Sequence, residues 1–280
     1  MVEIGKLNKL PIVKFVDFGL YLDAGNGEEI LLPIRYVTDD MNVGDEIDVF
    51  IYADSEDRLV ATTENPKAKV GEFAFLQVVA VNAVGAFLDW GLLKDVLVPF
   101  REQKVRMEKG RYYVVYIYLD DNTKRIVASA KLDKFLDNVV PKYNVGDEVE
   151  ILVTKRTDLG FKVVVDNMFG GMIYHNEIFK DINIGERQQA YIKSVRDDGK
   201  IDITLGNKGG VRVSSLAEEI IIYLQEHDGV MTLTDSSTPD EIRSTFQCSK
   251  KDFKKALGTL FKCGEILITS AEITLKEFRR

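Results

Sequence analysis

The sequence has very little cysteine and histidine, and it contains no hydrophobic run of membrane-spanning length. Its two cysteines, Cys248 and Cys263, are too few for a disulfide framework or a four-thiolate zinc site, and they fit a reducing cytosol. No apolar run approaches the ~18 residues that a membrane helix needs. The acidic N-terminus, rich in valine and glutamate, lacks a signal-peptide pattern. We therefore expect a cytoplasmic protein without a membrane segment.

The residue constellations that enzymes and metal sites need are also missing. His175 and His227 are the two histidines of the sequence, and neither stands at a ligand spacing from a cysteine or another histidine. There is no phosphate-binding glycine loop and no nucleophile elbow. The acidic pairs at 120–121 and 197–198 fall in equivalent turns between expected strands, so turn chemistry explains them better than a nuclease site. We expect a non-catalytic protein with no cofactor and no metal.

The composition is that of an ordinary globular protein. Its 280 residues correspond to roughly two domains of usual size, and 45% hydrophobic residues are enough for packed cores. The net charge of −8 argues against a protein that coats nucleic acid through bulk positive charge. A local basic surface is still compatible with this charge.

Repeated glycine spacings reveal an internal triplication. Glycine pairs separated by 39 residues begin at Gly5, Gly71 and Gly146. Further glycines follow the first of each pair by 14 residues, at Gly19, Gly85 and Gly160. These can permit a strand bend or a close backbone approach. The position 28 residues after the first glycine holds Pro33, Pro99 or Tyr174, and each unit is closed by a basic residue, Arg58, Arg125 or Lys200.

Each repeat is typical of β structure. In the third, the strands expected from Val- and Ile-rich segments between turns are Glu148–Thr154, Phe161–Asp166, Gly171–Tyr174, Gln189–Val195 and Lys200–Leu205. Five strands in about 65 residues match the OB-fold, a small Greek-key barrel. Other small barrels, such as SH3-like ones, have the same number of strands, so strand count leaves both open.

Particular segments resemble the RNA-binding domain of bacterial ribosomal protein S1. Residues 17–23 and 84–89 are similar to its Asp-Phe-Gly-Ala-Phe-Val segment, and residues 171–177 are similar to its Gly-Leu-Val-His-Ile-Ser-Glu segment. Its closing Arg-Ile-x-Leu-Ser strand is similar to residues 58–62, 125–129 and 200–204. The resemblance covers residues 4 to about 205, and it implies three OB barrels with an RNA-binding ancestry.

The pattern becomes helical after residue 205. Capping sequences at 215–218, 238–241 and 249–252 predict three helix starts, and Gly264 can end the third helix. Residues 266–268 and 273–275 flank a four-residue turn, as in a hairpin. Three helices closed by a hairpin make a winged helix. The predicted fold is multidomain and mainly β, with OB barrels at 1–65, 66–140 and 141–212 and an α+β winged helix at 213–280.

This order of domains resembles the conserved virulence factor B family of bacterial RNA-binding regulators. The most specific match is residues 249–262, which are similar to the family run Ser-Lys-Lys-x-Phe-Lys-Lys-Ala-x-Gly-x-Leu-Tyr-Lys. Residues 235–242 match as well. The resemblance implies a cytoplasmic, non-enzymatic RNA binder that affects the expression of other genes during or after transcription.

Charge is unevenly distributed among the four predicted domains. The net charge is −9 for residues 1–65, +3 for 66–140, 0 for 141–212 and −2 for 213–280. Because phosphate neutralisation dominates nucleic-acid affinity, the first repeat is a poor independent RNA site. The first repeat has an aromatic pair, Phe18 and Tyr21. This pair could stack on bases, as the matching residues of the resembled family do, or could pack in the core or against the next barrel.

Other candidate contacts lie in the later repeats and the third helix. A basic loop separates the third and fourth strands of the second repeat, and helix 249–262 carries five lysines and one acid. In the third repeat, Tyr174 stands at the position of the family's histidine. The first two repeats have Pro33 and Pro99 at this position, so they lack the hydrogen-bond donor and the stacking ring of a histidine. For each of these groups, the alternative to an RNA contact is an exposed side chain that only interacts with solvent. The RNA-binding candidates are Phe18, Tyr21, Phe87, Arg101, Lys104, Arg106, Arg111, Arg125, Tyr174, Lys193, Arg196, Lys200, Lys250, Lys251, Lys254, Lys255 and Lys262.

These observations favour a monomeric or weakly associating protein that binds single-stranded RNA. We expect the third barrel and the winged helix to form the main surface, extended by the basic loop of the second barrel. Two alternatives stay open: a protein-interaction adaptor for ribosome or transcription components, and a winged-helix DNA-binding regulator. The wing turn at 269–272 is not basic, which disfavours duplex DNA.

Overall fold

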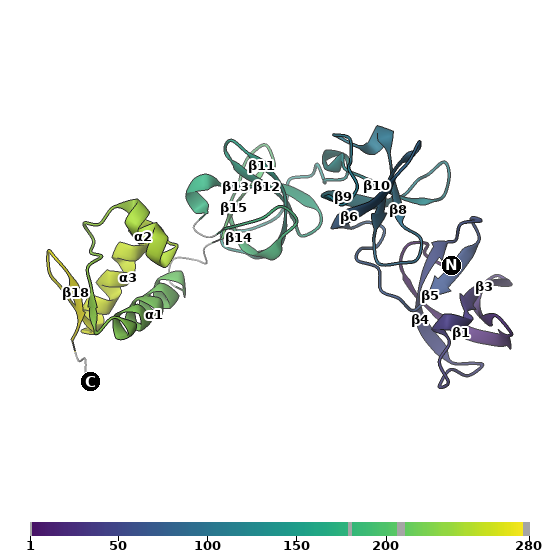
Figure 1. Cartoon of the computed structure of the whole chain (residues 1–280), viewed down its shortest axis with the longest axis horizontal. Coiled ribbons are helices and arrows are strands. Elements are labelled where there is room, and N and C mark those ends of the chain that lie inside the picture. Colours follow the sequence, from purple (N-terminus) through teal and green to yellow (C-terminus); the bar gives the residue numbers. More distant parts are fainter. Residues whose placement is uncertain (1, 179–180, 206–210, 277–280) are drawn as a thin grey trace. The chain divides into compact units, whose positions relative to one another are not determined.

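The computed structural model describes residues 2–178, 181–205 and 211–276, which form three closed five-stranded barrels and a helical domain with a small sheet (Figure 1). The first barrel contains β1 (Leu7–Val16), β2 (Gly19–Gly25), β3 (Glu28–Pro33), β4 (Glu46–Ala53) and β5 (Leu59–Thr62). The second contains β6 (Phe73–Val81), β7 (Gly85–Asp89), β8 (Val96–Pro99), β9 (Tyr112–Leu119) and β10 (Ile126–Ser129). The third contains β11 (Glu148–Thr157), β12 (Gly160–Val165), β13 (Phe169–Tyr174), β14 (Arg187–Val195) and β15 (Ile201–Thr204). The predicted fold class is confirmed.

All three barrels share one strand order. In the first, β1 pairs with β2 and β4, while β3 pairs antiparallel with β2 and parallel with β5. The antiparallel pair of β4 and β5 completes the ring. This order is that of the five-stranded Greek-key OB barrel. A short 3₁₀ helix follows the third strand of each barrel: η1 (Ile34–Tyr36), η2 (Phe100–Glu102) and η4 (His175–Glu177).

The second glycine of each repeated pair closes the same backbone contact in every barrel. The first strand of each barrel has a register shift, which marks a β-bulge. The glycine N–H donates to a carbonyl at this bulge over 2.8 Å in all three barrels: Gly44 to Ile12, Gly110 to Val78 and Gly185 to Val153. The spacing of 39 residues therefore corresponds to a hydrogen bond between the first strand and the loop before the fourth strand, which is repeated in all three barrels.

The middle glycines lie where two strands approach too closely for a side chain. Gly19, Gly85 and Gly160 begin the second strand of their barrels and pair with Pro33, Pro99 and Tyr174. A Cβ added at these glycines would lie 2.1, 2.3 and 1.9 Å from carbonyl oxygens of the neighbouring strand. Real Cβ atoms do not come this close, so the predicted close approach is confirmed.

The first two barrels pack together into one compact unit, Met1–Leu136. Along β4, Val49 and Ile51 fill the first barrel, whereas the alternate residues Phe50 and Tyr52 face outward and join the apolar cluster of the second barrel. The Phe50 ring meets Trp90 edge to face, with centroids 5.7 Å apart. Phe50 is fully buried by this contact.

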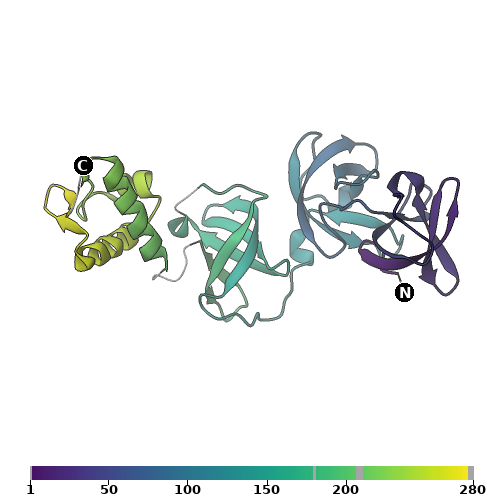
Figure 2. The same ribbon diagram turned by 90° about the horizontal axis from the view of Figure 1, so that it is seen from below.

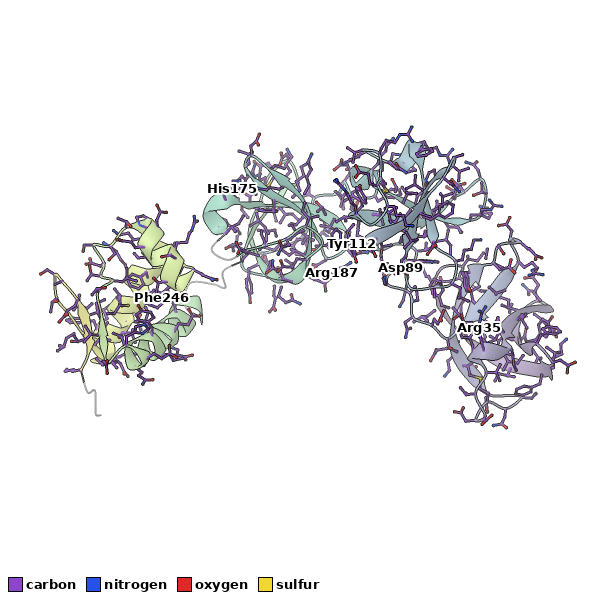
Figure 3. The ribbon with its side chains drawn as sticks, viewed as in Figure 1. Arg35, Asp89, Tyr112, His175, Arg187 and Phe246 are labelled. Atoms are coloured by element: carbon purple, nitrogen blue, oxygen red, sulfur yellow. The ribbon has the colours of Figure 1, made fainter. Side chains whose placement is uncertain are left out.

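The second compact unit, Asp137–Arg280, contains the third barrel and, after it, a winged helix. The elements of the winged helix are α1 (Val211–Glu226), β16 (Val230–Met231), α2 (Pro239–Phe246), α3 (Lys250–Cys263), β17 (Ile266–Ile268) and β18 (Ile273–Leu275). The three strands form one small sheet in the order β16-β18-β17, beside the helices in Figures 1 and 2. Phe246 lies among the helices and stacks on Phe253 at 5.4 Å (Figure 3).

The helix signals were mostly right. Thr238 and Glu241 form a reciprocal capping box at α2, Ser249 accepts from the N–H of Asp252 at α3, and Gly264 ends α3 in the left-handed conformation. The predicted start of the first helix near Ser215 was wrong. Helix α1 begins at Val211, since no proline or glycine in 211–215 stops it from extending backward. Strand β16 was missed because two residues are too few for a periodic pattern.

Candidate nucleic-acid interface

The aromatic pair of the first barrel lies on its exposed outer face. Phe18, in the turn before β2, is 55% exposed, and Tyr21 on β2 is half-buried. Their rings are 6.3 Å apart at 85°, so they form an edge-to-face pair rather than a flat shelf. The Lys14 ammonium lies 4.8 Å from the Tyr21 ring and also forms an ion pair of 2.5 Å with Glu29. Neither ring belongs to the barrel core, and the lysine beside them is already paired.

Most cations of the second barrel's basic loop are paired with acids. Arg101 contacts Asp120 at 3.2 Å, Lys104 contacts Asp133 at 2.7 Å, and Arg111 contacts Glu108 at 2.9 Å. The loop runs from η2 to β9, between the third and fourth strands, as predicted. Exposed ion pairs exchange partners at little cost, so these side chains can still reach a phosphate. Their positive field is nevertheless largely compensated.

Three aromatic side chains of the second barrel differ in their contacts and exposure. Arg106 stacks over Phe100, with its guanidinium carbon 3.9 Å from the ring centroid. Phe87, the counterpart of Tyr21, is half-buried on β7 opposite Ala80 of β6. Trp90, which the sequence places near these positions, is 3% exposed because it packs between the first two barrels. It therefore offers no face for stacking on a base.

Arg125 links the first two barrels. Its guanidinium forms an ion pair with Asp57 of the first barrel, and hydrogen bonding to this arginine lowers the pKa of Asp57. The Lys94 ammonium lies nearby and donates to the carbonyl oxygens of Ala53 and Asp54, at 3.0 and 2.5 Å. Burial lowers the pKa of Lys94. The basic residue that closes the second repeat thus forms an ion pair across the contact between the barrels.

In the third barrel, Tyr174 and Arg196 come together. The Arg196 guanidinium donates to the Tyr174 hydroxyl and lies 5.7 Å from its ring, while an ion pair of 2.9 Å joins it to Asp202. Hydrogen bonding to Asp202 raises the pKa of Arg196. The half-buried Tyr174 is therefore held in position by an arginine that is itself fixed. Lys193 pairs with Glu177 at 2.8 Å, and Lys200 pairs with Asp198 at 2.6 Å.

A lysine pair on the third barrel escaped the sequence-based list of candidates. Lys155 on β11 lies opposite Lys162 on β12, in the register that places Lys14 opposite Tyr21 in the first barrel. Both lysines are exposed, and neither has a carboxylate at ion-pair distance within the described residues. The signal was the repeat itself, because aligning the repeats puts Lys155 at the position of Lys14 and Lys162 at the position of Tyr21.

The lysines of α3 divide into bound and free groups. Lys250 donates to the carbonyl oxygens of Ser237 and Ser236, at 2.7 and 3.4 Å, so it secures the loop before the helix. Lys254 lies 3.5 Å from Asp235. The remaining three are exposed and have no carboxylate at ion-pair distance in the part of the chain that the structure describes: Lys251, Lys255 and Lys262. Phe253, Leu257 and Leu260 face the core.

Each of the two histidines lies beside an aromatic ring. His175 lies at the surface of the third barrel, 6.4 Å from the Phe161 ring (Figure 3). His227 stacks on Tyr223 at 3.9 Å just after α1. Within residues 2–178, 181–205 and 211–276, no three His, Cys, Asp or Glu side chains gather as metal ligands. No helix in the same ranges combines the length and apolar composition that a membrane crossing requires.

Comparisons with known proteins agree with this architecture. The S1 domain family matches residues 4–64 and 70–131, and the CvfB-like winged helix domain family matches residues 218–275. Both kinds of domain are typical of nucleic-acid-binding proteins, and neither is a catalytic domain. Together they indicate that this chain binds nucleic acid.

Similar proteins extend over nearly the whole chain. Uncharacterized protein YitL of Bacillus subtilis is 31% identical over 94% of this chain and 90% of its own length. Conserved virulence factor B of Staphylococcus aureus is 25% identical over 97% of this chain and 94% of its own. A solved multidomain protein with nucleic acid binding domains from Streptococcus pneumoniae is 26% identical, covering 97% of this chain and 98% of that one, with a TM-score of 0.45. The domain matches and the full-length similarity place this chain in the conserved virulence factor B family.

Proposed function

We propose that the protein binds single-stranded RNA through α3 and the third barrel, and acts in the cytoplasm as a non-catalytic regulator of gene expression. The observation that carries this proposal is the lysine face of α3, defined as Lys251, Lys254, Lys255 and Lys262. Three of its ammonium groups have no carboxylate at ion-pair distance among the described residues. Free ammonium groups can neutralise phosphates without first breaking an internal pair.

The third barrel supplies a second surface of the same character. Lys155 and Lys162 are exposed and unpaired within the described residues, and they occupy the positions that Lys14 and Tyr21 hold in the first barrel. Tyr174 adds a ring that Arg196 holds in place. Positive charge beside an aromatic ring is the usual chemistry of single-strand binding.

The composition of the winged helix favours RNA over duplex DNA. The exposed face of α3 carries lysines but no Arg, Asn or Gln, the residues that read base edges in a major groove. The wing turn between β17 and β18, Thr269–Glu272, contains an acid and no base. Lysines alone favour phosphate contacts, which position a strand without reading its sequence.

The test is fluorescence anisotropy of the full chain with a short unstructured RNA and a DNA duplex of matched length, over a range of salt concentrations. We expect salt-sensitive binding to the RNA. Replacing Lys251, Lys255 and Lys262 by Ala should reduce the slope of log K against log salt by about 2, since each single-strand phosphate contact contributes about 0.7. The matched control replaces three paired lysines, Lys6, Lys9 and Lys67, whose ammonium groups already face Glu3, Glu46 and Asp89.

Each other outcome assigns a different function. Preference for the duplex would make the winged helix a DNA reader. Absence of binding to either probe at low salt would favour an adaptor for ribosome or transcription components. An equal loss in the control variant would show that net charge, rather than the lysine face of α3, drives the interaction.

A further inference from the structure

An exposed aromatic ring lies beside the lysine face of α3. Phe261 is 55% exposed near the end of the helix, although Leu257, one turn earlier, is buried in the core. It is not part of the apolar cluster of the winged helix. Helical spacing puts Phe261 on the same side as Lys254, seven residues earlier. Core packing therefore does not explain this phenylalanine.

Gly258 lies one turn before Phe261, at a position where the fold does not require a glycine. Gly258 is in the middle of α3, where a glycine is about 1 kcal/mol less favourable than alanine. Its φ is not positive, and a Cβ built on it would meet nothing within 4 Å. Neither backbone conformation nor packing requires a glycine at this position. What the missing side chain does provide is a bare stretch of helix backbone.

Helical spacing places the lysines around that bare stretch. Lys251, Lys255, Gly258 and Lys262 follow one row along α3 at intervals of four, three and four residues, and Lys254, Gly258 and Phe261 follow a second row. Gly258 lies where the two rows cross. A strand laid across this point could approach the helix closely, with ammonium groups on both sides and an aromatic ring one turn away.

We propose that Gly258 and Phe261 form a site for one nucleotide of a single strand, with its phosphate over Gly258 and its base stacked on Phe261. This inference rests on the proposed RNA binding by α3 and adds to it a stacking residue and a point of backbone approach. Bases within a duplex have both faces covered by their neighbours, so a phenylalanine stacks there only after a base step has been unstacked, at a cost of a few kcal/mol. A base of a single strand offers a free face without that cost. Helix α3 thus binds a strand along its surface instead of entering a groove.

Substitutions of Phe261 test the stacking contact. Stacking is worth ~1–3 kcal/mol per base, so Phe261→Ala should weaken binding of a short unstructured RNA by about 5- to 150-fold. Phe261→Leu should lose nearly as much, because it keeps the apolar volume without the ring, whereas Phe261→Tyr should bind normally. The control is Ile222→Ala, which removes a 53% exposed apolar side chain from α1 in the same domain.

A spectroscopic signature separates stacking from charge attraction. Phe261→Trp places a second tryptophan on the exposed face of α3, whereas the native Trp90 is 3% exposed in the other unit. Stacked bases quench tryptophan fluorescence, so the single-stranded RNA should quench the variant well beyond the wild type. Equal quenching of the two proteins would overturn the stacking contact.

Gly258→Ala should move stability and binding in opposite directions. The variant should melt at a higher temperature because alanine favours the helix and its Cβ meets no neighbour, yet it should bind the RNA more weakly. If the lysine variant weakens binding while the Phe261 and Gly258 variants bind normally, the nucleotide site is wrong and the proposed function stands. If the lysine variant also binds normally, the proposed RNA surface on α3 fails as well.

Discussion

The contact between the first two barrels predicts a single unfolding transition for residues 1–136. Phe50 belongs to a strand of the first barrel but is fully buried in the cluster that surrounds Trp90 of the second. Its replacement by Ala removes the edge-to-face contact at 5.7 Å and leaves a cavity between the barrels. Comparable Phe→Ala substitutions cost about 3–5 kcal/mol. With a slope of about 2 kcal/mol per molar urea, the midpoint should fall by about 2 M.

The single tryptophan makes this prediction easy to measure. Trp90 reports on the second barrel, while the substitution at Phe50 is made in the first. Equilibrium urea unfolding followed by tryptophan fluorescence should therefore show the full destabilisation in a barrel that carries no mutation. Phe15→Ala is the matched control, because it removes the same ring from a 47% exposed position of the first barrel and should leave the midpoint nearly unchanged.

A small effect at Trp90 would refute the shared core. If Phe50→Ala lowers the stability of the first barrel by circular dichroism but leaves the fluorescence transition in place, the two barrels unfold independently. The same result would mean that the ion pair of Arg125 with Asp57 is a surface contact with little influence on folding.

Two further substitutions test the backbone of the third barrel and the pH response of the second. Gly160→Ala should abolish folding of the third barrel, because its Cβ would lie 1.9 Å from the Ile173 carbonyl oxygen; a cooperative melt like that of the wild type would contradict this. Burial raises the pKa of Glu102, but hydrogen bonds from Ser129 and Lys134 outweigh it and hold the pKa below its usual value. This stabilisation is therefore present at neutral pH and is lost as the pH falls through the folded-state pKa. Glu102→Gln should unfold at a lower urea concentration than the wild type at pH 7. This difference in urea midpoint should become smaller once the pH falls below 4.5, the ordinary pKa of a glutamate. A midpoint difference that does not change with pH would exclude the charge of Glu102 as its cause.

Local signals in the sequence were sufficient for the fold. The spacing of Gly5, Gly19 and Gly44 in the first repeat corresponds to backbone contacts within the first barrel. The equivalent glycines make the same contacts in the other two barrels. The caps at Thr238 and Ser249 are likewise satisfied within one turn of their helices. Such features could be predicted because the partner of each group lies nearby in the chain or is repeated at a fixed interval.

The candidate site was only partly accessible to the same reasoning. The lysine face of α3 was proposed as an RNA contact from the sequence, and the structure exposes its four side chains because they share one side of the 3.6-residue period. Phe261 lies on the same side of this helix, but an apolar residue in a helix usually packs in a core, and only the structure shows that this one is exposed. Lys155 required the three repeats to be aligned strand by strand.

The sequence by itself determined the number of barrels, the winged helix and the positive face of α3, because each depends on short-range patterns. Only the tertiary structure decided which cations are available. Arg125 has the right type and position for an RNA contact, yet its partner Asp57 is 68 residues away in another barrel. Phe50 likewise alternates with core residues along β4, and its burial depends on a neighbouring barrel. Ion pairs and burial between repeats arise from how domains pack, and no periodicity within one repeat encodes that packing.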